Sequence, residues 1–440
     1  MPVKNVCTDS RQAKAGDVFF AIRGEKFDGH EFVGEVAAKG VAAVVVERAG
    51  MPAVPPACAM LVVDDVRATL GKLATAYRND FDLPVIAVGG SNGKTTTKEL
   101  LASVLSQKLG TLASEASFNN DIGVPLSLLR LDRKHQAAVI EAGTNHPGEL
   151  APLLKMIRPK YGVITNIGRE HLEFFGDLAG VVQEEGWVAE LLAPDGKLFL
   201  NGDGEWTEKI AARTSAQVVR LGMADKNDWR AKGIRLDKSG VTFRVEAPVA
   251  AFSGEYRINL LGRHQVANAL FAIAIGCELG LGRAEIVDGL AACKPPKMRL
   301  QFWEANGVRV LDDTYNANAD STVAALETLC DLPLQGRRVA VLGDMGELGA
   351  HSEAAHAEVG RRAAELGIGQ LFAVGKMAPV MAQAARAAGL TRVIEFSEVE
   401  AAVVTVRKFL KAGDVVLLKA SRAARLERIA ETLKSEKNLN

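Results

Sequence analysis

The feature that most constrains the fold is a glycine-rich loop between an apolar run and a helix. Residues 84–88 read Pro-Val-Ile-Ala-Val, as expected of a buried strand, and Gly89-Gly-Ser-Asn-Gly-Lys-Thr-Thr96 follows them. Glycines let the backbone curl so that successive N–H groups point at phosphate oxygens, and the start of the helix adds partial positive charge. The order of strand, loop and helix therefore predicts a phosphate-binding loop in an α/β domain.

Within this loop, Lys94 is expected to reach the β- and γ-phosphates of ATP, and the Thr95 hydroxyl to join the shell of a magnesium ion. The strict phosphate-loop pattern is missed, because Val88 stands at its first glycine position. A glycine turn with an accidental Gly-Lys-Thr stays open as the alternative. The loop indicates ATP but does not name the reaction. The predicted ATP contacts from the loop are Gly90, Ser91, Asn92, Gly93, Lys94, Thr95 and Thr96.

The chain divides into three blocks, as its 440 residues lead one to expect. Residues 1–80 alternate short apolar runs with turns and one amphipathic stretch. Residues 81–297 hold the phosphate loop, further apolar runs at 137–140 and 161–165, β-like segments around 232–260 and an alanine-rich helix from Gln265 to Gly280. Residues 298–440 repeat strand and helix, which predicts a parallel, doubly wound sheet of Rossmann type.

In the third block we expect strands at 338–342, 371–374, 393–396 and 414–418, followed by helices at 352–366, 377–388, 398–410 and 422–434. No glycine fingerprint for a dinucleotide follows the first of these strands, because Gly343-Asp-Met-Gly346 has the wrong spacing. NAD binding is therefore not predicted.

Charge and cysteine content exclude several classes. Lysine plus arginine equals aspartate plus glutamate at 53 each, so no overall field attracts nucleic acid or anionic lipid. Five scattered cysteines without a C-x-x-C pair argue against a disulfide framework or a zinc finger. The first residues lack an apolar signal segment, and no apolar run is long enough to span a bilayer. We expect a cytoplasmic monomer that binds no nucleic acid and does not insert into a membrane.

Six further motifs are distributed over the three blocks: Thr8-Asp-Ser-Arg11, Gly24-Glu-Lys-Phe-Asp-Gly-His30, Asn119-Asn-Asp-Ile-Gly-Val-Pro125, Asn166-Ile-Gly-Arg-Glu-His-Leu-Glu173, Asp312-Asp-Thr-Tyr-Asn-Ala-Asn318 and Gly343-Asp-Met-Gly-Glu-Leu-Gly349. Together these motifs resemble the Mur ligase family, and the short form of the loop is similar to that of folylpolyglutamate synthetases as well. The resemblance covers essentially the whole chain. It implies a nucleotide-sugar domain, a central phosphate-loop ATPase domain and a C-terminal Rossmann-like domain, in agreement with the three blocks.

Within the family, the motifs resemble the branch that adds D-alanyl-D-alanine to UDP-N-acetylmuramoyl-tripeptide during synthesis of peptidoglycan precursors. The resemblance implies a carboxylate–amine ligase that uses ATP and Mg²⁺. A free carboxylate is a poor acyl donor, so the γ-phosphoryl group of ATP is first transferred to it, and the amine then attacks the acyl phosphate. Positive groups and metals are expected between ATP and the carboxylate.

Four residues are the predicted catalytic set: Lys94, Glu141, His171 and Glu185. Glu141 ends the apolar run 137–140, so its carboxylate is expected to project beyond a strand toward the nucleotide, and oxygen ligands suit magnesium. The resemblance makes Glu141 a metal ligand and His171 a ligand of a second magnesium. A solvated loop residue and a structural histidine are the alternatives. The predicted metal ligands are Thr95, Glu141, His171 and Glu185.

Glu185 is where the chain departs from the family pattern. Family members usually carry a lysine about fourteen residues after the metal-binding histidine, and carbon dioxide converts that lysine to a carbamate that helps hold the second magnesium. Here the position is Glu185, and no lysine lies between Lys160 and Lys197. Because glutamate supplies an anionic oxygen directly, we interpret Glu185 as a built-in substitute. A site in which water replaces this ligand is the alternative.

The remaining predicted site residues follow from the resemblance. Asn268, Arg299 and Asp313 match positions that contact the adenine, the phosphates and the ribose of ATP. Arginine and hydroxyl donors suit the diphosphate of the UDP-sugar. Asp344 and Glu347 are candidates for positioning the D-alanyl-D-alanine amine, although one of them could only cap the next helix. The predicted substrate contacts are Ser10, Arg11 and His30 for the UDP-sugar, Asn119 and Asn120 for the muramoyl end, and Asp344 and Glu347.

Two other functions stay open. The first is a different amide ligase, either another Mur ligase or a folylpolyglutamate-type enzyme, which residues 343–349 and Tyr315-Asn-Ala-Asn318 disfavour. The second is a non-catalytic regulator that retains the ATP loop. Against it stands the joint presence of Lys94, Thr95, Glu141 and His171, because an inactive site has no need of both metal positions.

Overall fold

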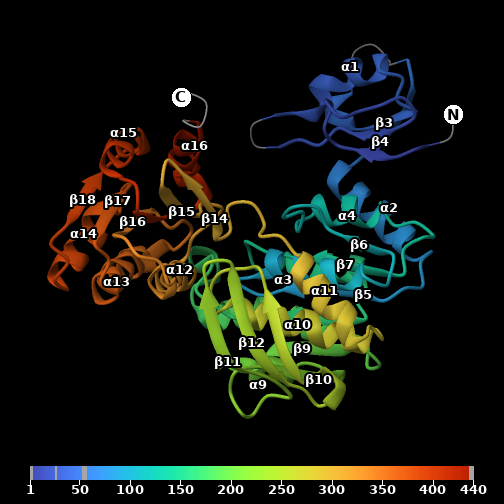
Figure 1. Ribbon diagram of the computed structural model, residues 1–440. Coiled ribbons are helices and arrows are strands. Elements are labelled where there is room, and N and C mark those ends of the chain that lie inside the picture. The colour runs from blue at the N-terminus through green and yellow to red at the C-terminus, as the bar shows by residue number, and fades with distance from the viewer. Residues whose placement is uncertain (1–2, 25–26, 52–56, 436–440) are drawn as a thin grey trace.

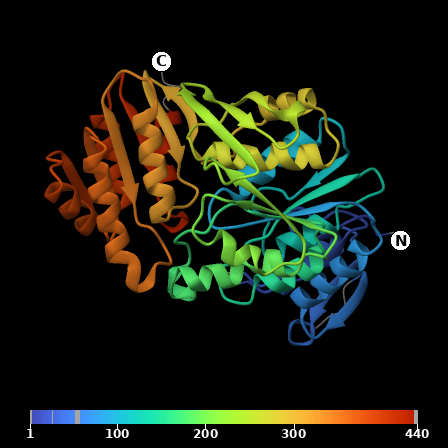
Figure 2. The ribbon, with the colours of Figure 1, turned by 90° about the horizontal axis from the view of Figure 1, so that it is seen from below.

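The computed structural model describes residues 3–24, 27–51 and 57–435, which form three sheets of 4, 9 and 6 strands. Glu25 and Lys26, within the motif Gly24 to His30, lie outside the described residues. The sheets succeed one another along the chain (Figure 1), and the blue N-terminal and the orange-red C-terminal parts lie at different ends of the central part (Figure 2). The sheets follow the three predicted blocks, whose boundaries stay a prediction.

The N-terminal domain is a parallel sheet of order β1-β2-β3-β4, and long apolar residues such as Phe19 and Val44 bury one of its faces. Helix α2 connects it to the next domain. Asp65 caps the start of α2, Leu70 packs against the first sheet, and Ala74 packs into the core of the central domain. The elements are β1 (Val6–Cys7), β2 (Val18–Phe20), η1 (Gly29–Phe32), α1 (Val33–Ala38), β3 (Ala43–Glu47), η2 (Arg48–Gly50), β4 (Ala59–Val63) and α2 (Val66–Arg78).

The central domain has a sheet of order β13-β12-β11-β10-β9-β8-β5-β7-β6. Its strands from β5 to β10 are parallel, and β11, β12 and β13 add an antiparallel meander. Helix α3 packs on α10 and α11 over one face. The elements before the meander are β5 (Val85–Gly89), α3 (Lys94–Leu105), β6 (Thr111–Ala113), α4 (Gly123–Leu128), β7 (Ala137–Glu141), α5 (Leu150–Ile157), β8 (Tyr161–Ile164), α6 (Leu172–Phe175), α7 (Leu178–Glu185), α8 (Trp187–Glu190), β9 (Lys197–Asn201), α9 (Thr207–Ala211) and β10 (Gln217–Gly222).

The β-like segments expected around 232–260 form this meander, and the alanine-rich helix that follows is α10. Most residues of α10 are buried, and its composition is accordingly largely apolar, with Gln265 and Asn268 as buried polar exceptions. The elements are β11 (Trp229–Asp237), β12 (Gly240–Glu246), η3 (Ala250–Phe252), β13 (Gly254–Ile258), α10 (Gln265–Glu278) and α11 (Arg283–Ala292).

The C-terminal domain is a Rossmann-like sheet of order β14-β15-β19-β16-β17-β18. The four predicted strands pair in parallel, as expected, and an antiparallel hairpin of β14 and β15, which was not predicted, extends one edge of the sheet. The elements are β14 (Gln301–Ala305), β15 (Val308–Asp313), α12 (Ala319–Asp331), β16 (Arg338–Gly343), η4 (Gly349–His351), α13 (Ser352–Glu365), β17 (Gln370–Val374), α14 (Ala378–Ala387), β18 (Val393–Phe396), α15 (Val399–Phe409), β19 (Val415–Lys419), η5 (Arg422–Ala424) and α16 (Glu427–Ser435).

The other expected strands and helices of this domain occur within a few residues of their predicted bounds. The last helix differs most: it starts at Glu427 instead of residue 422, because Arg425 adopts a left-handed conformation with φ of 51° that interrupts the helix. Over the part of the chain that the structure describes, no helix combines the length and the apolar character needed to cross a membrane.

Candidate active site

A cavity of about 710 Å³ lies between the central and C-terminal domains, at the carboxyl ends of β5, β7, β8 and β15. Open α/β sheets bind ligands at this end of their strands. The residues from Ser91 to Thr96 line the cavity. Of the other predicted site residues, it is lined by Asn119, Asn120, Glu141, His171, Asn268, Arg299, Asp313 and Glu347, whereas Gly90, Glu185, Asp344, Ser10, Arg11 and His30 are not among its lining residues.

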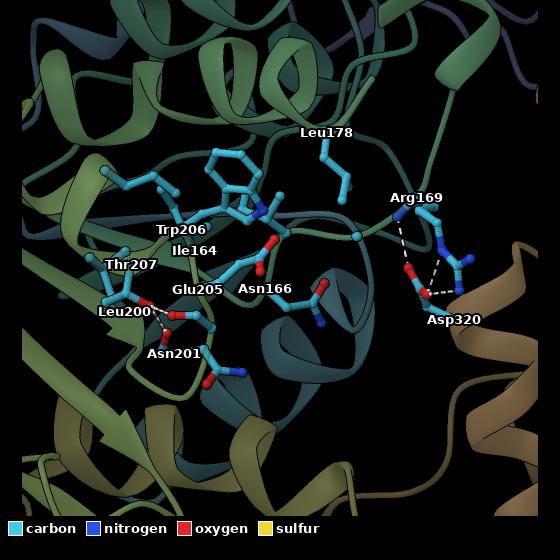
Figure 3. A pocket seen from close by; sticks show the side chains of 14 residues that line it. Ile164, Asn166, Arg169, Leu178, Leu200, Asn201, Glu205, Trp206, Thr207 and Asp320 are labelled. Atoms are coloured by element: carbon cyan, nitrogen blue, oxygen red, sulfur yellow. Dashed lines mark hydrogen bonds and ion pairs between the residues drawn. The ribbon is translucent and has the colours of Figure 1, made fainter. Parts of the chain in front are cut away.

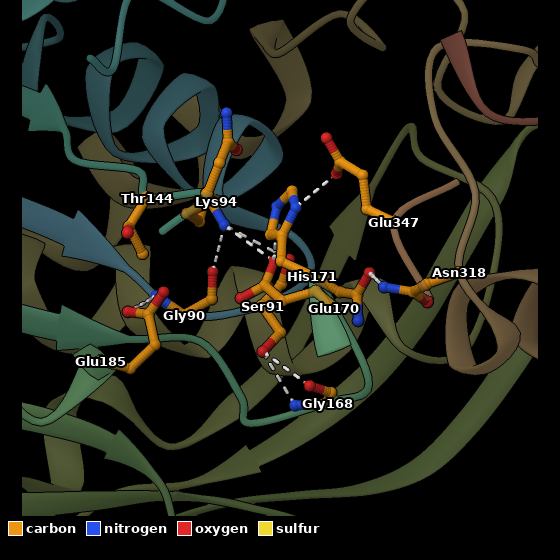
Figure 4. Close-up of polar contacts among 12 residues, drawn as sticks. Gly90, Ser91, Lys94, Thr144, Gly168, Glu170, His171, Glu185, Asn318 and Glu347 are labelled. Atoms are coloured by element: carbon orange, nitrogen blue, oxygen red, sulfur yellow. Dashed lines mark hydrogen bonds and ion pairs between the residues drawn. The ribbon is translucent and has the colours of Figure 1, made fainter. Parts of the chain in front are cut away.

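The phosphate loop takes the conformation that its glycines allow. Gly90 and Gly93 have φ of 105° and 85°, which side chains rarely permit, and a Cβ on Gly93 would lie 2.7 Å from Asn268 Oδ1. Lys94 starts α3 and folds back, so that its Nζ donates to the carbonyl oxygen of Gly90 at 2.5 Å (Figure 4). The loop thus holds the lysine against its own backbone.

The charge around Lys94 is strongly acidic. Its Nζ lies 3.4 Å from Glu170 Oε2, in a place where both side chains are almost fully buried. Burial alone would lower the pKa of Lys94, but the carboxylates of Glu170, Glu185 and Glu141 outweigh it and raise that pKa. One ammonium group faces three carboxyl groups, so the site is prepared to receive further positive charge.

The segment after β8 holds the loop from the opposite side. Asn166 Oδ1 accepts from the backbone N–H of Asn92 at 3.0 Å, and its Nδ2 donates to the Asn92 carbonyl at 3.1 Å. Ser91 Oγ accepts from the N–H of Gly168 at 2.8 Å and donates to its carbonyl at 3.2 Å. These reciprocal bonds fix the loop relative to residues 166–168, and Figure 4 shows the pair formed by Ser91 and Gly168.

Glu141 ends β7 beside the start of α3, as expected. Its Oε1 accepts from the Thr95 hydroxyl at 3.2 Å and from Asn119 Nδ2 at 2.9 Å. Its Oε2 is buried and finds no hydrogen-bond partner within the described chain. A buried carboxylate oxygen with spare lone pairs beside a threonine hydroxyl fits a magnesium ion, which prefers oxygen ligands and keeps phosphate or water in its shell.

His171 has left-handed backbone geometry, with φ of 48°. Its Nδ1 lies 2.5 Å from Glu347 Oε2 of the C-terminal domain, and its Nε2 lies 4.0 Å from Glu170 Oε2 (Figure 4). Among the residues described, no group of three or more His, Cys, Asp or Glu side chains is gathered closely enough to hold a metal. The structure therefore does not collect Glu141, His171 and Glu185 into one cluster, and phosphate or water oxygens are needed to complete any metal shell.

Glu185 lies beneath the loop at the end of α7 and is fully buried. Its Oε2 accepts from the N–H of Gly90 at 2.6 Å, while its Oε1 has no partner among the residues that the structure covers. Burial raises the pKa of Glu185 to about 7 against the lowering effect of Lys94. Glu185 thus lies next to the loop without lining the cavity, and its role as a metal ligand stays a prediction.

The C-terminal domain contributes the predicted residues Arg299 and Asp313 to the cavity, and one residue that was not predicted from the sequence. The Arg299 guanidinium stacks 4.1 Å from the ring centroid of Tyr315, and Asp313 Oδ1 accepts from the N–H of Leu300 at 3.1 Å. Lys419, at the end of β19, places its buried Nζ 2.5 Å from Asp313 Oδ2 and lines the cavity. The signal for Lys419 in the sequence was its position directly after an apolar run, at the end of a strand of the parallel sheet.

Glu170 is the second residue missed, although it directly precedes His171. Its Oε2 faces Lys94, and its Oε1 has no hydrogen-bond partner in the described parts of the chain.

Asn268 is buried on α10, where its Oδ1 accepts from the Thr97 hydroxyl at 3.2 Å and its Nδ2 donates to Gln265 at 2.8 Å. Asn268 therefore borders the loop as well as the cavity.

The predicted UDP-sugar residues lie in the N-terminal domain and contact their own neighbours. Arg11 is exposed and pairs with Asp9 at 2.6 Å, and the Ser10 carbonyl accepts from Lys39 at 2.8 Å. Both ring nitrogens of His30 are engaged: Nδ1 lies 2.6 Å from Asp28 Oδ1, and Nε2 accepts from the N–H of Glu47 at 3.0 Å. The structure does not bring these three residues to the cavity.

Asn120 and Asp344 already bind backbone groups. Asn120 Oδ1 accepts from the N–H groups of Ile122 at 3.2 Å and Gly123 at 2.9 Å, at the start of α4. The Asp344 oxygens accept from the N–H groups of Lys376 and Met377 at 2.9 and 3.0 Å, ahead of α14. Of the two candidates for the amine site, only Glu347 lines the cavity.

Comparison with known proteins identifies related families along the chain. Three family models match: Mur ligase family, catalytic domain, over residues 2–78; Mur ligase middle domain over residues 88–276; and Mur ligase, glutamate ligase domain, over residues 298–422. The UDP-N-acetylmuramoyl-tripeptide–D-alanyl-D-alanine ligase of Escherichia coli strain K12 is 37% identical over 434 residues, covering 97% of this chain and 93% of that protein. The enzyme of the same name from Bacillus subtilis strain 168 is 33% identical, covering 98% and 93%.

Solved structures agree with these relatives. A crystal structure of MurF from Acinetobacter baumannii matches with a TM-score of 0.89 at 35% identity, covering 98% of this chain and 94% of that one. MurF ligase from Thermotoga maritima in complex with ADP matches with a TM-score of 0.84 at 27% identity, covering 99% and 98%. Both likenesses extend over all three sheets.

Proposed function

The chain belongs to the Mur ligase family, and we infer that it is the ATP-dependent ligase that joins D-alanyl-D-alanine to UDP-N-acetylmuramoyl-tripeptide, a reaction of peptidoglycan precursor synthesis. Relatives with this name are 33 to 37% identical over nearly the whole chain. The structural observation that carries the inference is the acidic surrounding of Lys94 in a cavity that two domains share. The ADP complex of the Thermotoga maritima relative supports ATP as the nucleotide.

The reaction needs the γ-phosphoryl group to meet a carboxylate, two anions that repel each other. Lys94 is held by the Gly90 carbonyl and by Glu170, and it exchanges these partners for phosphate oxygens when ATP binds. The N–H groups of the loop and the start of α3 contribute further positive potential. Lys94 thereby stabilises the charge that accumulates on the transferred phosphoryl group.

We propose Mg²⁺ as the cofactor, held by the Thr95 hydroxyl and the free Oε2 of Glu141, with His171 and Glu185 as the predicted residues of a second site. Bound there, Mg²⁺ neutralises phosphate charge and orients the transferred group. Asn119 orients the Glu141 carboxylate through its 2.9 Å hydrogen bond. Glu185 supplies the negative charge that a carbamylated lysine supplies elsewhere in the family.

The C-terminal domain closes the other side of the cavity. We propose that Arg299, stacked on Tyr315, contacts the nucleotide phosphates, and that Asp313, paired with Lys419, contacts the ribose. Asn268 is placed for the adenine side. Glu347 is the better candidate for the incoming amine, because Asp344 is already committed to two backbone N–H groups.

The test is product formation with a panel of amine substrates. Purified enzyme with ATP, Mg²⁺ and UDP-N-acetylmuramoyl-tripeptide is offered D-alanyl-D-alanine, a diamino acid or glutamate, and products are identified by mass spectrometry. We expect a UDP-linked pentapeptide with D-alanyl-D-alanine and no comparable product with the other amines. Preference for glutamate or a diamino acid would assign the enzyme to another branch. Cytoplasmic location and a monomeric state stay predictions.

A further inference from the structure

Residues 168–171, here called the coupling segment, contact the two sides of the cavity in alternation. Gly168 and Glu170 contact the phosphate loop through Ser91 and Lys94. Arg169 and His171, between and after them, contact the C-terminal domain. The segment is therefore a short physical link between the nucleotide loop and the domain that closes over it.

Arg169 makes the most extensive of these contacts. Its backbone N–H donates to Asp320 Oδ2 at 2.8 Å, and its Nε and Nη2 donate to Asp320 Oδ1 at 2.9 and 2.6 Å. Its Nη1 and Nη2 also donate to the two oxygens of Glu358 at 2.5 and 3.1 Å. Hydrogen bonds to Glu358 and Asp320 raise the pKa of Arg169 further above its ordinary value. One guanidinium thus joins the central domain to the first turn of α12 and to α13.

The coupling segment has space on both sides. The nucleotide cavity is lined by Gly168, Glu170 and His171, and a second cavity of about 270 Å³ is lined by Gly168, Arg169 and Asp320 (Figure 3). Apolar side chains such as Trp206 and Leu178 also line this second cavity. Because cavities adjoin the segment on both sides, its polar contacts with the phosphate loop and with the C-terminal domain contribute much of what holds it in place.

We propose that Arg169 is a positioning residue: by docking the C-terminal domain on the coupling segment, it sets Glu170 against Lys94 and His171 against the cavity. Arg169 itself is not among the residues that line the nucleotide cavity, so it acts through its neighbours. The proposal rests on the proposed function, because it assigns Lys94 to ATP. It predicts that the correct placement of Lys94 depends on the ion pairs that Arg169 forms with the C-terminal domain.

The chain offers a matched control at the same domain boundary. Arg263, in the turn before α10, donates through Nε to Asp331 Oδ2 of the C-terminal domain at 2.7 Å. This pair joins the same two domains, but Arg263 is not part of the coupling segment and does not line the nucleotide cavity. If the loss of any contact between the two domains lowers activity, substitution of either arginine will lower it. If the effect comes from positioning, only substitution of Arg169 will lower it.

The experiment compares R169A, R169K and R263A with the unmodified enzyme. Steady-state kcat and KM for ATP are measured below the melting temperature of every variant, together with the Kd for UDP-N-acetylmuramoyl-tripeptide. We expect R169A to lower kcat/KM for ATP about tenfold, the scale of such couplings. R169K should recover part of this loss, R263A should stay within about twofold of the unmodified enzyme, and the Kd should be unchanged throughout.

A second variant keeps the test valid if R169A does not fold. The double substitution Asp320→Asn with Glu358→Gln removes both partner charges from the C-terminal domain and leaves the coupling segment unaltered; it should reproduce the loss in R169A. Equal effects of R169A and R263A, or normal kinetics in the double variant, would overturn the proposal. Failure of the proposed function would show separately, as an unmodified enzyme whose phosphate release does not depend on D-alanyl-D-alanine.

Discussion

The N-terminal domain and the boundary between the central and C-terminal domains hold their predicted residues in different ways. In the N-terminal domain, Arg11 and His30 contact partners close to them in sequence or within the same sheet. At the boundary, His171 contacts Glu347 and Asn92 contacts Asn318, residues far apart in the chain. The contacts at the boundary therefore depend on how the central and C-terminal domains are placed, whereas the contacts of Arg11 and His30 form within the N-terminal domain.

From this contrast we infer which region carries the reaction and which region recognises the UDP-linked substrate. Buried carboxylate oxygens of Glu141, Glu170 and Glu185, which have no hydrogen-bond partner in the part of the chain that the structure describes, surround Lys94 near the boundary. Such groups are costly unless a ligand or ion satisfies them, so they mark a site prepared for reaction. The predicted residues of the N-terminal domain are satisfied by local partners, and their contact with the UDP-sugar stays a prediction. Substitutions should accordingly alter turnover at the boundary and affinity in the N-terminal domain.

The largest effect is expected for Lys94→Ala. Removing a charge that stabilises the transferred phosphoryl group should lower kcat by at least about 10²-fold. Binding of UDP-N-acetylmuramoyl-tripeptide, measured by calorimetry, should stay nearly intact. Lys108→Ala, just beyond the far end of the same helix, is the control and should turn over normally. A near-normal rate in Lys94→Ala would remove the ATP assignment.

Glu185 should show the next largest effect. Glu185→Ala is expected to lower the rate about 10- to 100-fold, as loss of a group that tunes a metal site does. Glu185→Gln keeps the shape of the side chain but loses the charge, and should be similarly impaired. Glu185→Lys should also be poor, because an ammonium group repels the metal, and bicarbonate should restore part of its activity.

The unmodified enzyme supplies the control for Glu185. Its initial rate in degassed buffer should be indifferent to added bicarbonate, because a glutamate needs no carbon dioxide to carry its charge. A rate that rises severalfold with bicarbonate, or a Glu185→Ala variant as fast as the unmodified enzyme, would contradict the substitute-ligand interpretation.

In the N-terminal domain a smaller and more selective effect is expected. Arg11 is exposed, its ion-pair partner among the described residues is Asp9, and it is free to exchange this partner for a diphosphate. Arg11→Ala should raise KM for the UDP-linked substrate about three- to tenfold while kcat and KM for ATP change little. A loss of kcat as large as that of Lys94→Ala would show that the two regions do not differ in the way we describe.

The smallest effect concerns Asp28 and acid stability. Hydrogen bonds from the His30 N–H, the His30 ring and Arg23 lower the pKa of Asp28 from 3.8 to about 2. The folded state therefore holds this proton less tightly than the unfolded state, so the stabilisation is present above pH 3.8 and is lost as the pH falls toward 2. Asp28→Asn should lower the melting temperature at pH 5 more than at pH 2.5; an equal difference at both pH values would contradict this.

The sequence predicted the fold well wherever local pattern decided it. Apolar runs after turns gave the central strands and the four strands from β16 to β19, and the glycine loop predicted the start of α3 at Lys94. The β14–β15 hairpin was missed, because Gln301–Ala305 mixes polar and apolar residues at an exposed sheet edge. The interruption at Arg425 was missed because a left-handed arginine has no signature in the sequence.

The site was predicted less completely, for physical reasons. Glu141 and Lys94 were found because strand ends and glycine loops are local signals. Glu170, Lys419 and Arg169 were missed, because their importance comes from partners far along the chain, such as Asp313 for Lys419. Asp344 was assigned to the amine site although its oxygens bind backbone groups near α14, which only the fold reveals.

On the proposed function, ATP is cleaved and the amide is formed in one cavity between the central and C-terminal domains, so the two reactions should be coupled. The measurement that tests this coupling most directly is the initial rate of phosphate release with ATP and Mg²⁺, with UDP-N-acetylmuramoyl-tripeptide and D-alanyl-D-alanine each omitted in turn. We predict steady release with both substrates present and only background release when either is missing. Release at the full rate without one of them would contradict the claim.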